Sequence, residues 1–528
     1  MSDLPSSAAS SCVEKQKRCP AKSPFDREAA DIVFTTEDGV DFRVHKDVLS
    51  LASPFFADMF SLAQHAEGKG ENSNVVEPIQ IQESSQTFDH LLRLCYPVPD
   101  PVVQDLAELE LLLDAATKYQ MEEALSISSR MLRAFVDSNP LQTFVVACRF
   151  GAEEEAGLAA AAWKRSYRVG AQTAQKRVTK GKKPLRGQEI LPDYRDFAST
   201  FIATSYIPEM ADISAGIFFR LLYYGRTDLD ILPPFIKYDN SYPPAIRSKP
   251  TSYDEVEQWP IDPTDADVIL RSVNGKEFPF HKILLRLSEA TKLIDSGSTL
   301  EAEDGKLPIV QVGISSQVLN DLLRICLPSG GCVVEDTYRL WRLSRVALEY
   351  EMGPIVAAVK RQIQHKASTW PLSVYLITSQ NGWHDDAASA ARLLTEQVHI
   401  EDIYDPILED VPTSAYFSLL KYHHRCVTAM SKVMRKHVPE TTPVEWRRQT
   451  RYAHDTWPMY IPLPVAAREV ERQMQRGTPT KTQRSCDMIS TLISNGKSME
   501  NEIDDLLANV SSSFQRLYLC VNSVTDQT

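Results

Sequence analysis

Short motifs of the common catalytic and metal-binding sites are missing from the sequence. It contains no CxxC pair, no glycine-rich nucleotide-binding loop, no GxSxG nucleophile motif and no HExxH zinc motif. A structural zinc site needs four ligands at close spacing, whereas His423, His424 and Cys426 have no second cluster to complete one. We therefore predict a protein that is not an enzyme and that needs no cofactor and no metal. An uncharacterised enzyme is kept as the alternative of a different class.

Long apolar runs and an excess of basic charge are missing too. No run approaches the roughly 20 apolar residues that span a bilayer, and the first residues lack the basic and apolar regions of a secretory signal. The 57 Lys and Arg against 70 Asp and Glu give a formal charge of −13, which argues against a nucleic-acid-binding fold. With nine cysteines, an odd number, these features predict an intracellular protein, cytoplasmic or nuclear or both. We expect no direct contact with nucleic acid or membrane.

The sequence does contain a duplication. Residues 30–51 (ADIVFTTEDGVDFRVHKDVLSL) align with residues 266–287 (ADVILRSVNGKEFPFHKILLRL) at a separation of 236 positions. Residues 84–97 (SSQTFDHLLRLCYP) align with residues 315–328 (SSQVLNDLLRICLP) at a separation of 231 positions. A period of domain size indicates two copies of one unit of roughly 200 residues rather than a solenoid.

Each copy begins with the pattern of a β-hairpin followed by helices. In the first copy, alternating apolar residues flank a turn at Gly39, which supplies a permissive backbone position. Apolar residues at helical spacing follow from Val48, and Pro54 suits the first turn of a second helix with Ser53 as its N-cap. The pattern then predicts a short strand and two amphipathic helices, at residues 79–81, 85–94 and 106–119.

This pattern resembles the BTB/POZ domain family over about residues 30–135 and again over about 266–366. In the first copy the likeness is carried by the leading Asp-Ile pair, the His-Lys pair at the end of the hairpin and Leu-Ala-Ser-Pro-Phe-Phe at residues 51–56. The later Ala-x-Lys-Tyr-x-Met pattern adds to it, and the ending CYPVPDP resembles the BTB variant of large fungal families. In the second copy Leu-Ser-Glu-Ala-Thr-Lys replaces the Ser-Pro-Phe-Phe step.

The resemblance implies that exposed surfaces of the two units bind protein. The interaction candidates are the residues at the BTB motif positions: Asp31, His45, Lys46, Phe55, Phe56, Asp267, His281 and Lys282. In some relatives the Asp and Lys positions line a charged pocket near a dimer interface. The alternative is that the carboxylate only caps a strand and the lysine lies on the surface. Met59 and Phe60 accompany Phe55 and Phe56, and some of these four must belong to the core.

The expected fold is α+β. It has two BTB/POZ-like units, each a short β-sheet flanked by helices and followed by an α-helical extension that resembles a BACK extension, and a C-terminal helical tail. The repeat continues into these extensions at residues 213–226 and 412–425. The expected segments are a disordered N-terminus at 1–25, the first unit at 26–135, its extension at 136–232, a Pro-rich linker at 233–263, the divergent second unit at 264–366, its extension at 367–438, a Pro-bearing connector at 439–484 and an amphipathic or coiled-coil helix at 485–520.

One basic segment stands out in this acidic chain. Residues 164–186 hold nine Lys and Arg and no acid, as an insertion found only in the first copy. They form either a solvated basic face or a nuclear-localisation patch. The residues of that patch are Lys176, Arg177, Lys180, Lys182 and Lys183.

The expected function is that of a noncatalytic protein–protein interaction or scaffold protein. We expect it to associate with protein partners and with itself, either by pairing of the two BTB-like units within one chain or as a homodimer. The resemblance leaves two alternatives open, a substrate adaptor of a cullin-3 ubiquitin ligase and a transcription-associated nuclear scaffold.

Overall fold

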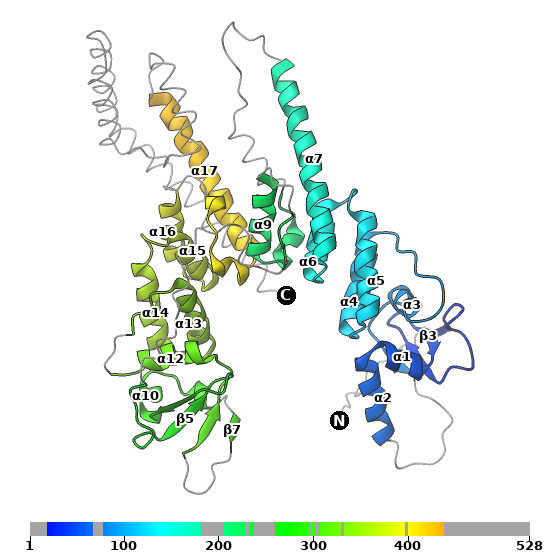
Figure 1. Cartoon of the computed structure of the whole chain (residues 1–528), viewed down its shortest axis with the longest axis horizontal. Helices are drawn as coiled ribbons and strands as arrows, with labels where there is room; N and C mark the ends of the chain where they lie inside the picture. Colours follow the sequence, from blue (N-terminus) through cyan, green and yellow to red (C-terminus); the bar gives the residue numbers. More distant parts are fainter. Residues whose placement is uncertain are drawn as a thin grey trace, which may run out of the picture. The chain divides into compact units, whose positions relative to one another are not determined.

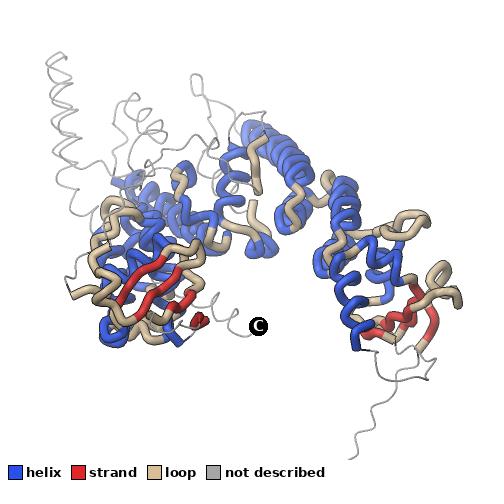
Figure 2. Tube along the Cα trace, turned by 60° about the horizontal axis from the view of Figure 1, so that its bottom comes forward, coloured by secondary structure: helices blue, strands red, loops and turns tan. Residues whose placement is uncertain are grey.

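A computed structural model describes residues 18–66, 78–180, 205–226, 232–236, 259–295, 298–300, 307–328, 332–395 and 400–437. Two compact units make up the chain (Figure 1). The first unit comprises residues 1–170 and 234–237, and the second comprises residues 171–233 and 238–528. Both units combine a small sheet with helices (Figure 2), as expected for an α+β fold.

The first unit contains a four-stranded sheet in the order β1-β3-β2-β4. The central hairpin is antiparallel and pairs Phe34 with Phe42, both of which are buried because alternate side chains of a strand share one face. Gly39 holds a φ of 80° in the turn, as predicted from the sequence. The strands are β1 (Cys19–Pro20), β2 (Ile32–Thr35), β3 (Val40–Val44) and β4 (Ile79–Gln80).

Helices follow the strands of this sheet along the chain, and those of residues 46–118 lie at the predicted places. The side chains of Ser84 and Asp105 accept hydrogen bonds from backbone amides in the first turns of α3 and α4, which explains where those helices begin. The helical segments are α1 (Lys46–Ala52), α2 (Pro54–Ala66), α3 (Ser85–Arg93), α4 (Leu106–Lys118), α5 (Glu122–Met131), η1 (Leu132–Phe135), α6 (Pro140–Arg149) and α7 (Glu153–Lys180).

The prediction of a disordered segment at residues 1–25 is wrong for its last part. Cys19–Pro20 pairs in parallel with β3, and Phe25 is only 1% exposed. The ring of Phe25 packs edge-on against Tyr96 with 5.3 Å between centroids, and its carbonyl accepts a hydrogen bond from the amide of Arg43 at 2.8 Å. One aromatic side chain thus anchors a segment that its Ser, Ala and Pro content did not mark as folded. Residues 1–17 lie outside the described part.

Both ends of the predicted linker at 233–263 are also folded. Phe235 is fully buried in the first unit and packs edge-on against Phe144, while the Ile236 amide donates to the Glu153 carboxylate at 3.0 Å. In the second unit, the indole nitrogen of Trp259 donates to the Pro279 carbonyl at 2.9 Å. Aromatic anchors therefore fix both ends of the predicted linker, and residues 237–258 lie outside the described part.

The second unit contains a second four-stranded sheet, in the order β6-β5-β8-β7. Its hairpin has the same register as the first hairpin, shifted by 236 positions: Val268 pairs with Phe280 where Ile32 pairs with Val44. The turn glycine, Gly275, has a φ of 78°. The strands are β5 (Val268–Arg271), β6 (Glu277–Phe280), β7 (Ser298–Leu300) and β8 (Ile309–Gln311).

Helices of the second unit come from two distant parts of the sequence. Most follow β6, but η2 (Pro208–Asp212) and α9 (Ala215–Arg226) precede the linker and pack against the last helices of this unit. The other helical segments are α10 (Lys282–Leu287), α11 (Lys292–Asp295), α12 (Ser316–Ile325), α13 (Thr337–Glu349), α14 (Gly353–His365), α15 (Pro371–Gln380), α16 (His384–Leu394), η3 (Ile400–Asp402), η4 (Pro406–Glu409) and α17 (Thr413–His437).

Two predicted C-terminal segments, the connector at 439–484 and the helix at 485–520, lie outside the described residues. No described helix has the length and apolar character needed to cross a membrane.

Ser53 ties the corner between α1 and α2 to the end of α4. Its buried hydroxyl donates to the Tyr119 carbonyl at 2.6 Å and accepts from the Phe56 amide at 3.1 Å, so it caps α2 as predicted.

Replacing Ser53 by alanine is expected to destabilise the protein by about 1–2 kcal/mol, because the α2 cap is lost and a buried carbonyl loses its donor. Urea unfolding followed by circular dichroism measures this change. The matched control is Ser50→Ala on α1, at a half-buried position. Equal effects of the two substitutions would contradict the role assigned to Ser53.

Candidate interaction surface

The corner between α1 and α2 of the first unit exposes apolar side chains. Leu51 is 91% exposed, Leu62 is 73% exposed and Phe55 is 38% exposed. Phe55 and Leu62 stand seven positions apart on α2, a spacing that places them on the same side of a helix. We call Leu51, Phe55 and Leu62 the α1–α2 face. Contiguous apolar patches on a protein surface mark interaction sites more often than isolated apolar side chains do.

The opposite side of α2 belongs to the core. Phe56 is 1% exposed and Phe60 is 6% exposed. The Phe56 ring stacks on Tyr119 with 4.9 Å between centroids and meets Phe34 edge-on at 5.7 Å. Phe56, one of the predicted interaction residues, therefore packs inside the unit, whereas Phe55 reaches the surface.

Asp31 and Lys46 meet through the backbone of Lys46. The Asp31 carboxylate accepts a hydrogen bond from the Lys46 amide at 2.8 Å, at the start of α1. The Lys46 ammonium lies 6.0 Å from the centroid of the Phe60 ring, within reach of a weak cation–π contact. The neighbouring His45 amide donates to the Tyr96 hydroxyl at 2.8 Å. These contacts fix the start of α1, and a role of Asp31 and Lys46 in binding a partner stays a prediction.

The second unit repeats part of this arrangement. The Asp267 carboxylate accepts from the Lys282 amide at 2.7 Å, and His281 precedes α10 as His45 precedes α1. Leu287, the counterpart of Leu51, is 72% exposed, and Ile283 is 56% exposed. The segment that follows differs, because α11 has 4 residues where α2 has 13. The second unit therefore keeps an exposed apolar α10 but not a long second helix.

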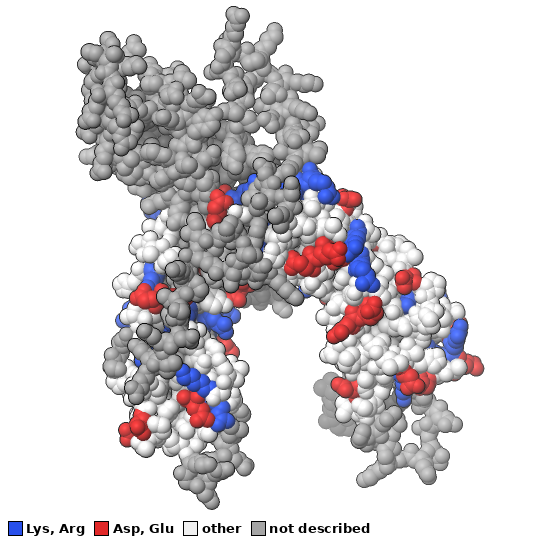
Figure 3. All heavy atoms as spheres, in the orientation of Figure 1, with Lys and Arg blue, Asp and Glu red and all other residues white. Residues whose placement is uncertain are grey.

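The side chains of the possible nuclear-localisation patch are not among the described ones. The backbone of Lys176, Arg177 and Lys180 is helical as the end of α7, and their side chains, like Lys182 and Lys183, lie outside the described part. In the described ranges no group of three or more His, Cys, Asp or Glu residues is placed to hold a metal. On the face drawn in Figure 3, acidic and basic side chains of the described surface are interspersed, without a continuous field of one sign.

Glu83 contacts Tyr119, whose ring packs against Phe55 of the α1–α2 face. Its side chain is 10% exposed, binds the Lys118 ammonium at 2.6 Å and accepts from the Tyr119 hydroxyl. Tyr119 in turn packs against both Phe55 and Phe56. Burial alone would raise the pKa of Glu83, but the hydrogen bonds from Lys118 and Tyr119 outweigh it and hold the pKa below its usual value.

Sequence reasoning did not single out Leu51, Leu62 or Glu83. Leu51 could have been found from the duplication, because Leu287 repeats it at a helix end. The exposure of Leu62 depends on the orientation of α2, and the role of Glu83 depends on contacts with residues 35 and 36 positions away.

Comparison with known proteins supports the identification of the first unit. Residues 22–135 match the family model described as BTB/POZ domain. BTB/POZ domains are generally protein–protein interaction modules, mediate self-association and are typically noncatalytic. A search of curated proteins gave no match.

A Glu83→Gln variant is expected to lose about 1–2 kcal/mol of unfolding free energy at pH 7, because a charge-assisted contact becomes a neutral one. Because the pKa of Glu83 is lowered in the fold, this contribution is present above the ordinary glutamate pKa of about 4.3 and disappears as pH falls through the lowered value.

Urea unfolding of the variant and the parent between pH 3 and pH 7 tests this, and the two curves should converge on acidification. Glu277→Gln, which removes the carboxylate of an exposed ion pair with Arg271, is the control and should change stability little. A difference for Glu83→Gln that stays constant with pH would contradict the assignment.

Proposed function

We propose that the protein is a noncatalytic interaction scaffold with two BTB-like units, and that the α1–α2 face of the first unit binds a second copy of the chain. The observation that carries this proposal is the exposure of Leu51, Phe55 and Leu62 on a unit that matches the BTB/POZ domain. Burial of apolar area is the main favourable term in protein association, so such a face gains free energy when a partner covers it.

The repeated sheet geometry supports a second BTB-like unit. The hairpin registers coincide after a shift of 236 positions. In each sheet one later strand, β4 in the first unit and β8 in the second, pairs in parallel with the first strand of the hairpin. The capping contact of Asp31 recurs at Asp267. Three independent features, two backbone registers and one side-chain contact, thus favour one fold used twice.

Differences between the units favour pairing between two chains over pairing within one chain. A twofold pair buries the same residues on both sides. The first unit offers the 13-residue α2, whereas the second offers the 4-residue α11, with Lys292 at the position of Phe56. Two first units, one from each chain, can form a symmetric pair, and the two units of one chain cannot match their surfaces in this way.

Replacing both Leu51 and Leu62 by glutamate is expected to convert a dimer into a monomer, because two charges would have to be buried without partners. Light scattering of the full chain over a range of concentrations should give twice 59.4 kDa for the parent and 59.4 kDa for the double variant. The matched control is Val102→Glu, an 81% exposed valine outside the α1–α2 face, and it should remain dimeric.

A parent chain that is monomeric at every concentration, or a double variant that still dimerises, would contradict the proposal. The same three proteins, tested for binding to cullin-3, decide the adaptor role: retention of cullin-3 by the parent chain would support that alternative, and no binding at micromolar concentration would reject it.

A further inference from the structure

The tail of the first repeat is built into the second unit. Residues 205–226, which precede the linker, pack against residues 400–426, which end the second repeat (Figure 1). We call these two segments the first tail and the second tail. Two backbone hydrogen bonds join them, from the Ala215 amide to the Val411 carbonyl at 2.8 Å and from the Thr413 amide to the Ile213 carbonyl at 3.2 Å.

These two bonds are reciprocal after a shift of 198 positions. The shift takes Ala215 to Thr413 and Ile213 to Val411, so each bond is the image of the other. The sequence alignment of residues 213–226 with 412–425 corresponds to a shift of 199, one position more than the structure requires. The apolar pattern of these two segments is not regular enough to fix their alignment to within one residue.

Ring contacts between the tails follow the same shift. Tyr206 stacks on Phe417 with 3.9 Å between centroids, and its image is the edge-on contact of Tyr404 with Phe219 at 5.6 Å. The contact of Phe218 with Phe417 at 6.4 Å has its image in Phe219 with Tyr416 at 6.3 Å. The two tails are therefore related by a local pseudo-twofold axis, as two copies of one segment are in a homodimer.

Ion pairs made by two arginines of the first tail break this symmetry. Arg226 binds Glu401 at 3.2 Å and Asp402 at 2.8 Å, whereas its image is His424.

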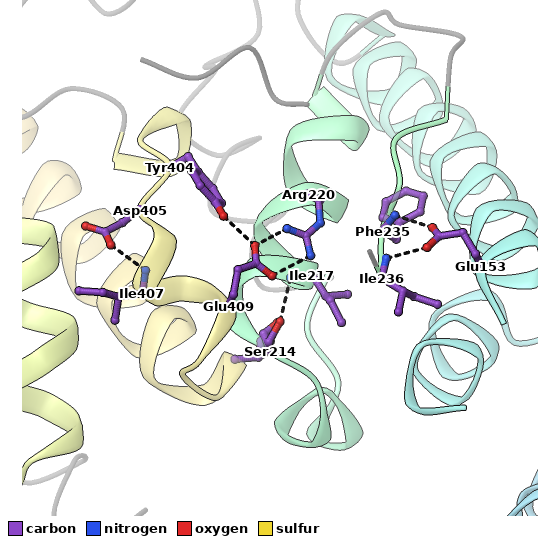
Figure 4. A network of polar contacts seen from close by, with 11 residues as sticks. Glu153, Ser214, Ile217, Arg220, Phe235, Ile236, Tyr404, Asp405, Ile407 and Glu409 are labelled. Atoms are coloured by element: carbon purple, nitrogen blue, oxygen red, sulfur yellow. Dashed lines mark hydrogen bonds and ion pairs between the residues drawn. The ribbon is translucent and has the colours of Figure 1, made fainter. Parts of the chain in front are cut away.

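The guanidinium of Arg220 is fully buried and makes a bidentate contact with Glu409, which also accepts from the Tyr404 hydroxyl at 3.0 Å (Figure 4). Shifted by 198 positions, Arg220 becomes Ser418, and Glu409 becomes Ala211. The image of the ion pair is thus a serine and an alanine.

A glycine next to the ion pair adds to the asymmetry. A Cβ atom at Gly216 would meet the carboxylate of Glu409. The image of Gly216 is Ser414, which carries a side chain. The first tail therefore has the space and the cation that Glu409 needs, and the second tail has neither at the equivalent positions.

We propose that the tails form a selective clasp, in which the first tail binds the second tail of the chain and pairs of like tails are excluded. In a pair of first tails, each Arg220 would face Ala211 and lose the carboxylate of Glu409. In a pair of second tails, each Glu409 would face Ser418 and meet the side chain of Ser414. A pair of first tails would bury Arg220 without this carboxylate, which is costly, and a pair of second tails would deprive the partly buried Glu409 of its guanidinium partner. This inference goes beyond the proposed function and does not depend on it.

The test cuts the chain and asks whether its halves stay together. A specific protease site is placed within residues 240–256, the folded full-length protein is cleaved to completion as judged on a denaturing gel, and the C-terminal half is captured by an affinity tag. The parent should retain its N-terminal half. Arg220→Ala and Glu409→Gln should each weaken this association about a hundredfold or more, because breaking a buried ion pair costs about 3–5 kcal/mol and 1.4 kcal/mol is tenfold.

Arg339→Ala is the matched control. It breaks an ion pair with Asp321, whose side chain is 2% exposed, between α12 and α13 of the second repeat. This variant should lose stability but keep the halves together, so that general destabilisation is separated from loss of the clasp. Circular dichroism before cleavage checks that each variant is folded.

Two results would overturn the proposal. One is release of the N-terminal half from the cleaved parent, or its full retention in both Arg220→Ala and Glu409→Gln. The other is dimerisation of the uncut chain that carries Leu51→Glu and Leu62→Glu, if adding Arg220→Ala changes the fraction of dimer measured by light scattering. That result would show that the tails pair between copies of the chain.

Discussion

The packing of Phe56 between Phe34 and Tyr119 sets the orientation of α2, and the proposed interaction surface follows from it. A helix can turn only one side toward the sheet, so once Phe56 and Phe60 face inward, Phe55 and Leu62 must face outward. Truncating a buried phenylalanine costs about 3–5 kcal/mol, far more than exposing a leucine. The core therefore determines the surface, and the α1–α2 face is the consequence of a well-packed interior.

The second unit illustrates what happens when this anchor is absent. Lys292 occupies the position of Phe56, α11 has only 4 residues, and β7 then joins the sheet beside β8. A charged side chain cannot replace the aromatic ring in a dry core, so the second unit lacks the anchor that orients α2 in the first. The repeated hairpin register is kept all the same, because it depends on alternating apolar residues such as Phe278 and Phe280, both of which remain buried.

Local elements were predicted well from the sequence, and contacts between distant segments were not. The hairpins with Gly39 and Gly275, the cap at Ser53 and the helices α3 and α4 depend on neighbouring residues, whose patterns are visible in the chain. The anchors Phe25 and Phe235 were assigned to disorder and to a linker, because a single aromatic residue among Ser and Pro gives no periodic signal. The pairing of Arg220 with Glu409 joins residues 189 positions apart, which no local pattern can reveal.

Hydrogen exchange of the full chain at low and high protein concentration tests the central claim most directly. If the α1–α2 face pairs two copies, amides of residues 46–66 should exchange more slowly at high concentration, while residues 282–295 keep the same rates. Concentration-independent exchange at residues 46–66, or slowing confined to residues 282–295, would contradict the account.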